Sequence, residues 1–140
     1  MTNLEMLRLG QAGHGPRAGW RETVGARIAE VEAGSVTIEL DAEARHRHEG
    51  GVVQGGVITQ IADAAMGMSL MTMQETGWAN TTIELKINFI RPVVEGRLRA
   101  VGTVVEMRRS LLFSKAEVRD SEGRLVARAS STCLAVPRNT

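Results

Sequence analysis

The sequence predicts one α+β domain in which an antiparallel sheet packs against a single long helix. Residues 57 to about 73 form the one long segment with a helical pattern of apolar side chains. Downstream, the pattern changes to a period of two, most clearly over residues 82–89, as expected for a half-buried strand. The strands that follow are joined by short connections, which favours antiparallel pairing. A sheet with one buried face needs a cover, and only the long helix can supply it.

The chain divides at about residue 20. We expect residues 1–20 to form an N-terminal arm, with a short helix over Leu4 to Leu9. The glycine-rich stretch GQAGHGPRAG follows this helix and is typical of irregular structure. Residues 21–140 form the predicted domain, and 140 residues suffice for one hydrophobic core.

Two strands are expected before the long helix. The first covers residues 22–31, and the second belongs to a hairpin with Gly34 in its turn. Val36, Ile38 and Leu40 alternate with polar residues and should face inward. Residues 41–54 are polar and then glycine-rich, which indicates a loop.

Four strands are expected after the helix. In the first, Ile83, Leu85, Ile87 and Phe89 should point inward, with Thr82, Glu84, Lys86 and Asn88 on the other face. Pro92 ends this strand. The next three are expected over residues 98–104, 113–120 and 124–136, with turns at 108–110 and 120–123.

The composition excludes several classes of function. A net charge of +1 gives no bulk attraction to nucleic acid or membranes, and aromatic residues make up only 3% of the chain. The first residues do not resemble a secretory signal, and no apolar stretch is long enough to span a bilayer. One cysteine suits a reducing compartment. We therefore expect a cytoplasmic protein without nucleic-acid or membrane partners.

The long helix carries an unexpected acid. Its circumference is apolar or small almost all round, which predicts burial on most sides, with a partner subunit covering what the sheet does not. Asp63 lies on a narrow polar stripe with Thr59, Gln60 and Gly67. An unpaired buried acid costs several kcal/mol, and glycine inside a helix costs roughly 0.5–1 kcal/mol relative to alanine. Gly67 therefore indicates either close packing or room for a ligand.

The start of this helix suggests an anion-binding site. Gln54, Gly55 and Gly56 precede it, and glycines let a ligand oxygen approach the free N–H groups there, as in an oxyanion hole. Asp63 lies eight residues beyond Gly55, roughly 12 Å along a helix. The two features of one chain cannot easily meet at one carbonyl group. We therefore expect a two-fold dimer in which each site combines the helix start of one subunit with Asp63 of the other.

Residues 48–67, HEGGVVQGGVITQIADAAMG, resemble the hotdog-fold acyl-CoA thioesterases of the PaaI-like (phenylacetate-degradation) group. Those proteins usually read Asn, two residues, Gly, two residues, His-Gly-Gly, then a helix with Asp nine residues after the His. The resemblance extends over about residues 22–136. It implies a hotdog fold, an antiparallel sheet wrapped around one long helix. It also implies hydrolysis of a thioester to a carboxylic acid and CoA.

The resemblance implies roles for individual residues. The amides of Gly55 and Gly56 would polarise the thioester carbonyl, and Asp63 would act as nucleophile or as general base towards water. Thr82, with Thr81 as the weaker alternative, would assist from the strand after the helix. Two positions depart from the common pattern.

Gln54 replaces the usual His, and we expect it to fix the loop through hydrogen bonds. His48 replaces the usual Asn and would orient water or the carbonyl. Arg91, Arg108 and Arg109 are candidates for the CoA phosphates, since arginine suits phosphate recognition. CoA enters as part of the substrate, and no separate cofactor or metal is expected. The expected assembly is a dimer, further paired into a dimer of dimers.

Simpler interpretations stand beside some of these. His46 and His48 are two of only three histidines, too few for a metal site, and are expected to be a solvated loop pair. Met66, Met68, Met71 and Met73 suit core packing better than a flexible acyl pocket. Cys133 is expected to be a small strand residue.

Two other functions remain as alternatives. A hotdog hydratase or dehydratase pairs Asp and His in a different motif, which this sequence lacks. A non-catalytic acyl-CoA-binding or sensing module would use the same pocket without turnover, and Gln54 and His48 keep this open. The residues do not decide between aryl-acetyl and medium-chain acyl groups.

Overall fold

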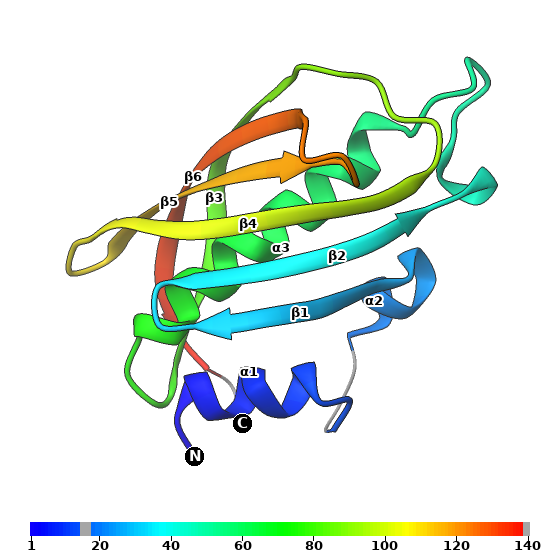
Figure 1. The fold of residues 1–140 in the computed structure, drawn as a ribbon. Helices are drawn as coiled ribbons and strands as arrows, with labels where there is room; N and C mark the ends of the chain where they lie inside the picture. Colours follow the sequence, from blue (N-terminus) through cyan, green and yellow to red (C-terminus); the bar gives the residue numbers. More distant parts are fainter. Residues whose placement is uncertain (15–17, 139–140) are drawn as a thin grey trace.

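The computed structural model describes residues 1–14 and 18–138, and Figure 1 shows its fold. The elements follow one another in the order predicted: two strands, the long helix, then four strands, with helical segments at the N-terminal end. They are α1 (Asn3–Gln11), α2 (Gly19–Val24), β1 (Ala26–Glu32), β2 (Ser35–Ala42), a 3-10 turn (Ala44–His46), α3 (Gly55–Met73), β3 (Trp78–Phe89), β4 (Gly96–Met107), β5 (Leu111–Arg119) and β6 (Leu125–Pro137).

The six strands form one antiparallel sheet in the order β1-β2-β4-β5-β6-β3. The sheet curves around α3, which lies across its inner face, while α1 lies beneath β1 (Figure 1). This arrangement confirms the predicted α+β class and the hotdog architecture of a sheet wrapped around one helix.

The core lies between α3 and the sheet. Val36, Ile38 and Leu40 of β2 are fully buried, as their alternation predicts. At Gly102 of β4, an added β carbon would collide with the backbone of Ala65 in α3. Glycine is therefore required there, because helix and sheet come into backbone contact. This contact fixes the depth at which α3 sits in the sheet.

The N-terminal region differs from the prediction. The short helix is confirmed, but residues 22–24 belong to α2 and not to a strand, because Gly25 ends that helix in a left-handed conformation (φ 84°). The arm is also packed against the domain: Leu7 is buried in the core, and the buried Asn3 amide donates hydrogen bonds to the carbonyls of Gln74, Glu75 and Trp78. Part of the glycine-rich stretch, residues 15–17, lies outside the described residues.

Strand β3 differs from its predicted alternation. Leu85 and Ile87 are half-buried, as expected, but the side chains of Ile83 and Phe89 are 56% and 53% exposed. The register with β6 shifts between Thr82 and Glu84, so Ile83 sits in a β-bulge. Because the bulge reverses the alternation, Thr82 shares the inner face with Leu85 instead of lying opposite to it.

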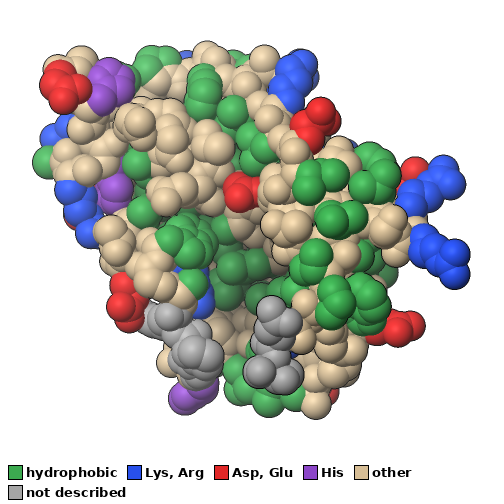
Figure 2. Space-filling view, turned by 180° about the vertical axis from the view of Figure 1, so that it is seen from behind, with side chains coloured by type: hydrophobic (Ala, Val, Ile, Leu, Met, Phe, Trp, Pro, Cys, Tyr) green, Lys and Arg blue, Asp and Glu red, His purple; other side chains and the backbone are tan. Residues whose placement is uncertain are grey.

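One edge of the sheet is left open. Within residues 1–14 and 18–138, β3 pairs with β6 alone, and it exposes the large apolar side chains of Trp78, Ile83 and Phe89. The face seen from behind in Figure 2 carries many hydrophobic side chains and is hollowed near its centre, with charged groups mainly at its margins. None of the described helices is long and apolar enough to cross a bilayer.

Candidate active site

Asp63 is half-buried on α3 and faces the strand that carries the bulge. Its Oδ1 atom accepts a hydrogen bond of 2.7 Å from the Oγ1 of Thr82 in β3. A carboxylate held by a hydroxyl donor keeps its second oxygen for another partner. The structure thus brings Thr82, which the resemblance implies would assist, into direct contact with the acid.

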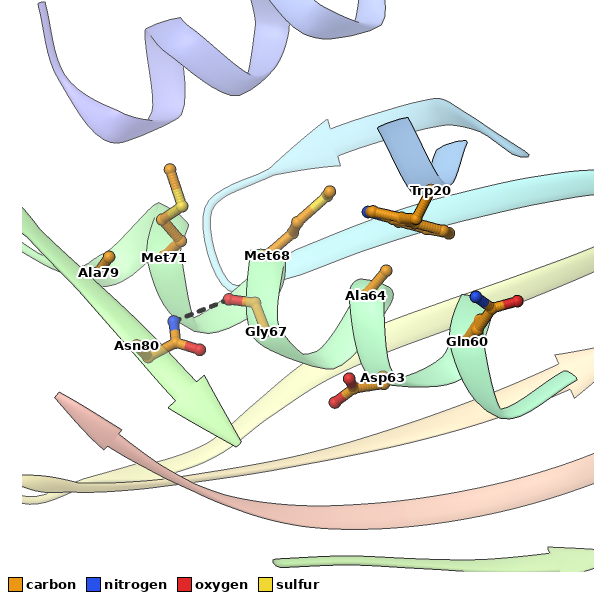
Figure 3. Close-up of a pocket in the computed structure, with 9 residues that line it drawn as sticks. All are labelled: Trp20, Gln60, Asp63, Ala64, Gly67, Met68, Met71, Ala79 and Asn80. Atoms are coloured by element: carbon orange, nitrogen blue, oxygen red, sulfur yellow. Dashed lines mark hydrogen bonds between the residues drawn. The ribbon is translucent and has the colours of Figure 1, made fainter. Parts of the chain in front are cut away.

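A cavity of about 360 Å³ lies beside this carboxylate. In Figure 3, Trp20 of α2 stands over the turn of α3 that carries Ala64, and Met68 and Met71 follow along the helix. Asp63 and Gln60 supply polar groups to the same wall. The lining is mostly apolar, which suits a hydrophobic ligand group beside a reactive acid. The residues that line the cavity are Trp20, Gln60, Asp63, Ala64, Gly67, Met68, Met71, Ala79 and Asn80.

Gly67 lies where α3 and β3 approach each other. The Asn80 amide donates a hydrogen bond of 3.0 Å to the Gly67 carbonyl, drawn as a dashed line in Figure 3. An added β carbon on Gly67 would lie 3.4 Å from the Asn80 Oδ1. That distance is an ordinary van der Waals contact, so packing against Asn80 does not by itself require glycine, and Gly67 also lines the cavity.

The start of α3 presents free donors. Gln54 is its N-cap, and the Val57 amide is the first that bonds back, to the Gln54 carbonyl at 2.9 Å. The amides of Gly55 and Gly56 donate no hydrogen bond to any part of the chain that the structure describes. The Gln54 side chain lies against Gly56, where an added β carbon would be 2.6 Å from its Oε1. The two amides can therefore receive an oxygen from outside the chain.

These donors and Asp63 do not converge within one chain. Gly55 and Gly56 are absent from the lining of the Asp63 cavity, and they lie two helical turns away on the same helix. A carbonyl group held at the helix start of one chain is thus out of reach of that chain's own carboxylate.

The two loop histidines have different environments. His48 is exposed, and its Nδ1 accepts a hydrogen bond of 2.8 Å from the Gly50 amide within its own loop. His46 is buried: its Nδ1 accepts from the Glu43 amide, and its Nε2 donates to the Val24 carbonyl. The expectation of a solvated pair is therefore wrong for His46, which ties α2 to the 3-10 turn. No cluster of metal-ligating side chains occurs within residues 1–14 and 18–138.

The other predicted residues lie apart from the cavity. Thr81 is exposed on β3, next to Thr82, and Arg91 is exposed just after that strand. Arg108 and Arg109 are exposed in the turn between β4 and β5, which projects at the end of the sheet away from the start of α3 (Figure 1). The Arg108 guanidinium lies 3.5 Å from the Glu106 carboxylate. A single chain thus does not gather these cations around Asp63.

Sequence reasoning missed part of the cavity wall. Core packing is predicted for most of the four methionines, but only Met66 is fully buried. Met68 and Met71 line the cavity, and Met73 is 51% exposed. Met68 and Met71 share one side of α3, so their helical spacing was an available signal. Trp20 carries no signal of its own, because α2 brings it to the site from outside the motif.

Comparison with known proteins agrees with this fold. Residues 50–127 match the thioesterase superfamily, and the chain belongs to that family. The matched segment contains the glycines, Asp63 and Thr82.

Among curated relatives, a protein of Saccharolobus solfataricus provisionally named as an esterase is 28% identical over 103 residues, 74% of this chain and 73% of its own. A thioesterase family protein from Silicibacter pomeroyi has a TM-score of 0.84 and 25% identity, covering 97% of this chain and 99% of its own.

Two further structures are similar. A conserved protein from Pseudomonas aeruginosa has a TM-score of 0.82 and 31% identity, covering 86% of this chain and 95% of its own. A variant of the phenylacetic acid degradation protein PaaI from Thermus thermophilus has a TM-score of 0.77 and 21% identity, with coverages of 84% and 98%. At 21% identity, the similarity to PaaI shows a shared fold alone. Family and site together support thioester hydrolysis as the general class of reaction.

Proposed function

We propose that this protein is an acyl-CoA thioesterase in which Asp63 drives hydrolysis. The observation that carries the proposal is the Asp63 carboxylate, fixed by the Thr82 hydroxyl at 2.7 Å beside a largely apolar cavity. A fixed acid next to a hydrophobic pocket suits a substrate with an apolar acyl chain and a polar reacting centre.

Asp63 can act in either of two alternative ways. As general base, it takes a proton from water while the water oxygen attacks the thioester carbon. The C–S bond then breaks, and the CoA thiolate leaves and is protonated. As nucleophile, its free oxygen attacks the same carbon, CoA leaves, and water hydrolyses the resulting anhydride. Single turnover in ¹⁸O-labelled water identifies a nucleophilic route in which water attacks the Asp63 carboxyl carbon of the anhydride, because only that attack places label in the Asp63 carboxylate.

The Gly55 and Gly56 amides are the proposed oxyanion hole. They stand at the positive end of a 19-residue helix, where developing negative charge on the carbonyl oxygen is stabilised. Gln54, at the N-cap, would orient this turn through its side chain. His48 is proposed as a support of the preceding loop, where it already holds the Gly50 amide.

The complete site requires two chains. Strand β3 has twelve residues, and the backbone donors and acceptors that do not point towards β6 are unpaired along its free edge, beside the exposed Trp78, Ile83 and Phe89. Such an edge favours pairing with another strand. Antiparallel pairing of two β3 edges gives a two-fold dimer and sets the two α3 helices antiparallel. The helix start of one subunit then lies beside Asp63 of the other, and a dimer of dimers is the proposed higher assembly.

The cavity is the proposed acyl site. Trp20, Met68 and Met71 provide an aromatic and adaptable wall, which suits aryl-acetyl or medium-chain acyl groups. Arg91, Arg108 and Arg109, all exposed, are proposed contacts for the CoA phosphates in the dimer, with Thr81 at the strand beside the entering thioester.

Thiol release from a panel of acyl-CoAs, measured for the native protein and for Asp63→Asn, tests the proposal. Asparagine retains the size and can still accept from Thr82, but it cannot serve as a carboxylate nucleophile or base. We expect turnover on apolar acyl-CoAs and a loss of at least about a hundredfold in kcat for the variant. Equal turnover by both proteins would mean that Asp63 is not the reacting group.

A non-catalytic acyl-CoA-binding module is the second candidate. The Phe89 ring lies against Gly55 and narrows the approach to one of the two oxyanion donors. For such a module, acyl-CoA would raise the melting temperature while no thiol is released from any member of the panel.

A further inference from the structure

Four polar side chains form a hydrogen-bonded row that leads from Asp63 into the core. The Thr82 Oγ1, which donates to Asp63, lies 3.7 Å from the Cys133 Sγ. The Cys133 Sγ lies 3.8 Å from the Ser131 Oγ, which lies 2.9 Å from the Ser114 Oγ. The distances that involve sulfur fit weak thiol hydrogen bonds, and the last is an ordinary hydroxyl bond.

The register of the sheet produces this row. Thr82 is the cross-strand partner of Cys133 between β3 and β6, and Ser131 is the partner of Ser114 between β6 and β5. Cys133 and Ser131 are two residues apart on β6, so they share one face. The bulge at Ile83 is what turns Thr82 to that same face. A structural irregularity thus joins the row to the proposed catalytic acid.

Thr82 is exposed, but the three members of the row behind it are shielded from water. Cys133 is fully buried, and Ser114 and Ser131 are 2% and 6% exposed. Leu70 and Leu112 pack with Cys133 in a small hydrophobic cluster. A buried hydroxyl without a partner is costly, and a small apolar residue would fill such a position without that cost. Three successive polar residues therefore call for a reason beyond packing.

The carboxylate at one end fixes the direction of every bond. An ionised carboxylate only accepts, so the single Thr82 proton is committed to Asp63. In the Thr82–Cys133 hydrogen bond, the Thr82 oxygen must then accept from the Cys133 thiol. Because this uses the thiol proton, the Cys133 sulfur must accept from the Ser131 hydroxyl. Ser131, in turn, must accept from Ser114. All four protons therefore point towards the reacting acid.

We propose that Cys133 is a positioning residue for the hydrolysis, which acts through Thr82 and is itself oriented by Ser131 and Ser114. This inference rests on the proposed function, in which Asp63 is the reacting group. By donating to the Thr82 oxygen, the thiol holds the threonine rotamer that points its proton at Asp63, and hydrogen bonds in such a series strengthen one another. The free oxygen of Asp63 is thereby kept directed at water or the thioester carbon.

A first experiment needs no enzymatic activity. Cys133 is the single cysteine of the chain, so the S–H stretching band in the Raman spectrum reports this thiol alone. A thiol that donates a hydrogen bond has a lowered S–H frequency. Thr82→Val removes the acceptor and should raise the frequency, whereas Ser131→Ala removes only a donor and should leave it nearly unchanged. A shift in Ser131→Ala but not in Thr82→Val would reverse the direction of the row and overturn the proposal.

A double-mutant cycle then tests the effect on catalysis. Cys133→Ala should lower kcat by about two- to tenfold, the range of one neutral hydrogen bond, with little change in KM. In a Thr82→Val background, the same substitution should lower kcat by less than about twofold, because the route through Thr82 is already lost. An equal loss in both backgrounds would show that Cys133 does not act through Thr82.

Val126→Ala is the matched control, because Val126 is also fully buried on β6 but lies outside the row. It should lower the melting temperature without lowering kcat. If the protein hydrolyses no thioester, the proposed function fails, but the Raman result still tests whether the Cys133 thiol donates to Thr82. If it hydrolyses thioesters and the cycle is additive, the positioning role alone fails.

Discussion

The Phe89 ring packs against Gly55, so that a β carbon added to the glycine would lie 3.0 Å from the nearest ring atom. Gly55 opens α3, and Phe89 is the last residue of β3. The glycine thus leaves room for the ring as well as for a ligand, and the ring forms one side of the approach to the helix start. Because the Phe89 side chain is 53% exposed, it can shift to admit a substrate or a new methyl group.

Gly55→Pro should remove one oxyanion donor while keeping the helix. Proline has no N–H and is well tolerated at the first position of a helix, and the extended backbone of Gln54 (φ −64°, ψ 134°) suits a following proline. Loss of one such donor lowers kcat by about 10²–10³-fold. Thiol release under saturating acyl-CoA measures this effect.

Gly55→Ala is the control for Gly55→Pro, because it introduces a β carbon against Phe89 but keeps the amide. We expect it to retain activity within about tenfold of the native protein, since the displaced ring is exposed and the lost packing is small. If alanine is as damaging as proline, the space beside Phe89 matters and the amide does not, which would contradict the oxyanion assignment.

Trp20→Ala should weaken the selection of bulky acyl groups. The indole forms one wall of the cavity beside Asp63, and an aromatic side chain contributes a large apolar contact area. We expect kcat/KM for aryl-acetyl or medium-chain acyl-CoA to fall about tenfold, and that for acetyl-CoA to change little, because an acetyl group does not reach the wall. Leu9→Ala removes an exposed apolar side chain of the same N-terminal region outside the cavity, and it should leave both values unchanged.

Most of the fold followed from local patterns in the sequence. Val36, Ile38 and Leu40 alternate with polar neighbours, and Gly34 stands in the turn with a φ of 84° that favours glycine. The bulge at Ile83 had no such signal, because the apolar alternation runs through residues 82–89 without interruption. Only pairing with β6 shows where the extra residue lies. The helix α2 was missed since its six residues are too few to display a period.

The site was predictable as far as it lies in one segment. Asp63 and Gly67 share a helical stripe, and the glycines at the helix start stand next to each other in sequence. Trp20 and Cys133 come from the two ends of the chain, and their places beside Asp63 and Thr82 depend on the tertiary fold. Spacing along the sequence holds no information about such contacts. The roles of His48, Gln54 and the arginines stay predictions that need a dimer and a ligand to be tested.

Asp41→Asn should remove a stabilising contribution that exists only above acid pH. The Arg27 guanidinium, with help from Arg97, donates hydrogen bonds to Asp41 and holds the pKa of that carboxyl below its ordinary value of 3.8. Because the folded-state pKa is lowered, the contribution is complete above the unfolded-state value of about 4 and is lost as the pH falls through the folded-state value. The carboxylate is 59% exposed, so the effect on the free energy of unfolding at neutral pH stays below about 1 kcal/mol.

Urea unfolding of the native protein and of Asp41→Asn at neutral pH and at successively more acidic pH measures this contribution. The difference between the two proteins should shrink towards zero as the pH falls below about 4. Glu49→Gln, in an exposed loop, serves as the control for the loss of one surface charge. A difference that grows on acidification would mean that Asp41 is not stabilised by its arginine partners.

Mixing two inactive variants should restore activity if each site is built from two chains. One chain carries Asp63→Asn with an intact helix start, and the other carries Gly55→Pro with an intact Asp63. In a hybrid dimer, one site combines Gly55 of the first chain with Asp63 of the second and is intact, whereas the other site has both defects. Random assembly makes half of the dimers hybrid, and half of their sites work, so the mixture should reach about a quarter of native activity.

Co-expression with two different affinity tags isolates the hybrid, which should retain about half of native activity. The contrary result is a hybrid as inactive as its parents although light scattering shows a folded dimer. Such a result would mean that Asp63 and the helix start of the same chain form the site, across the two helical turns that separate them.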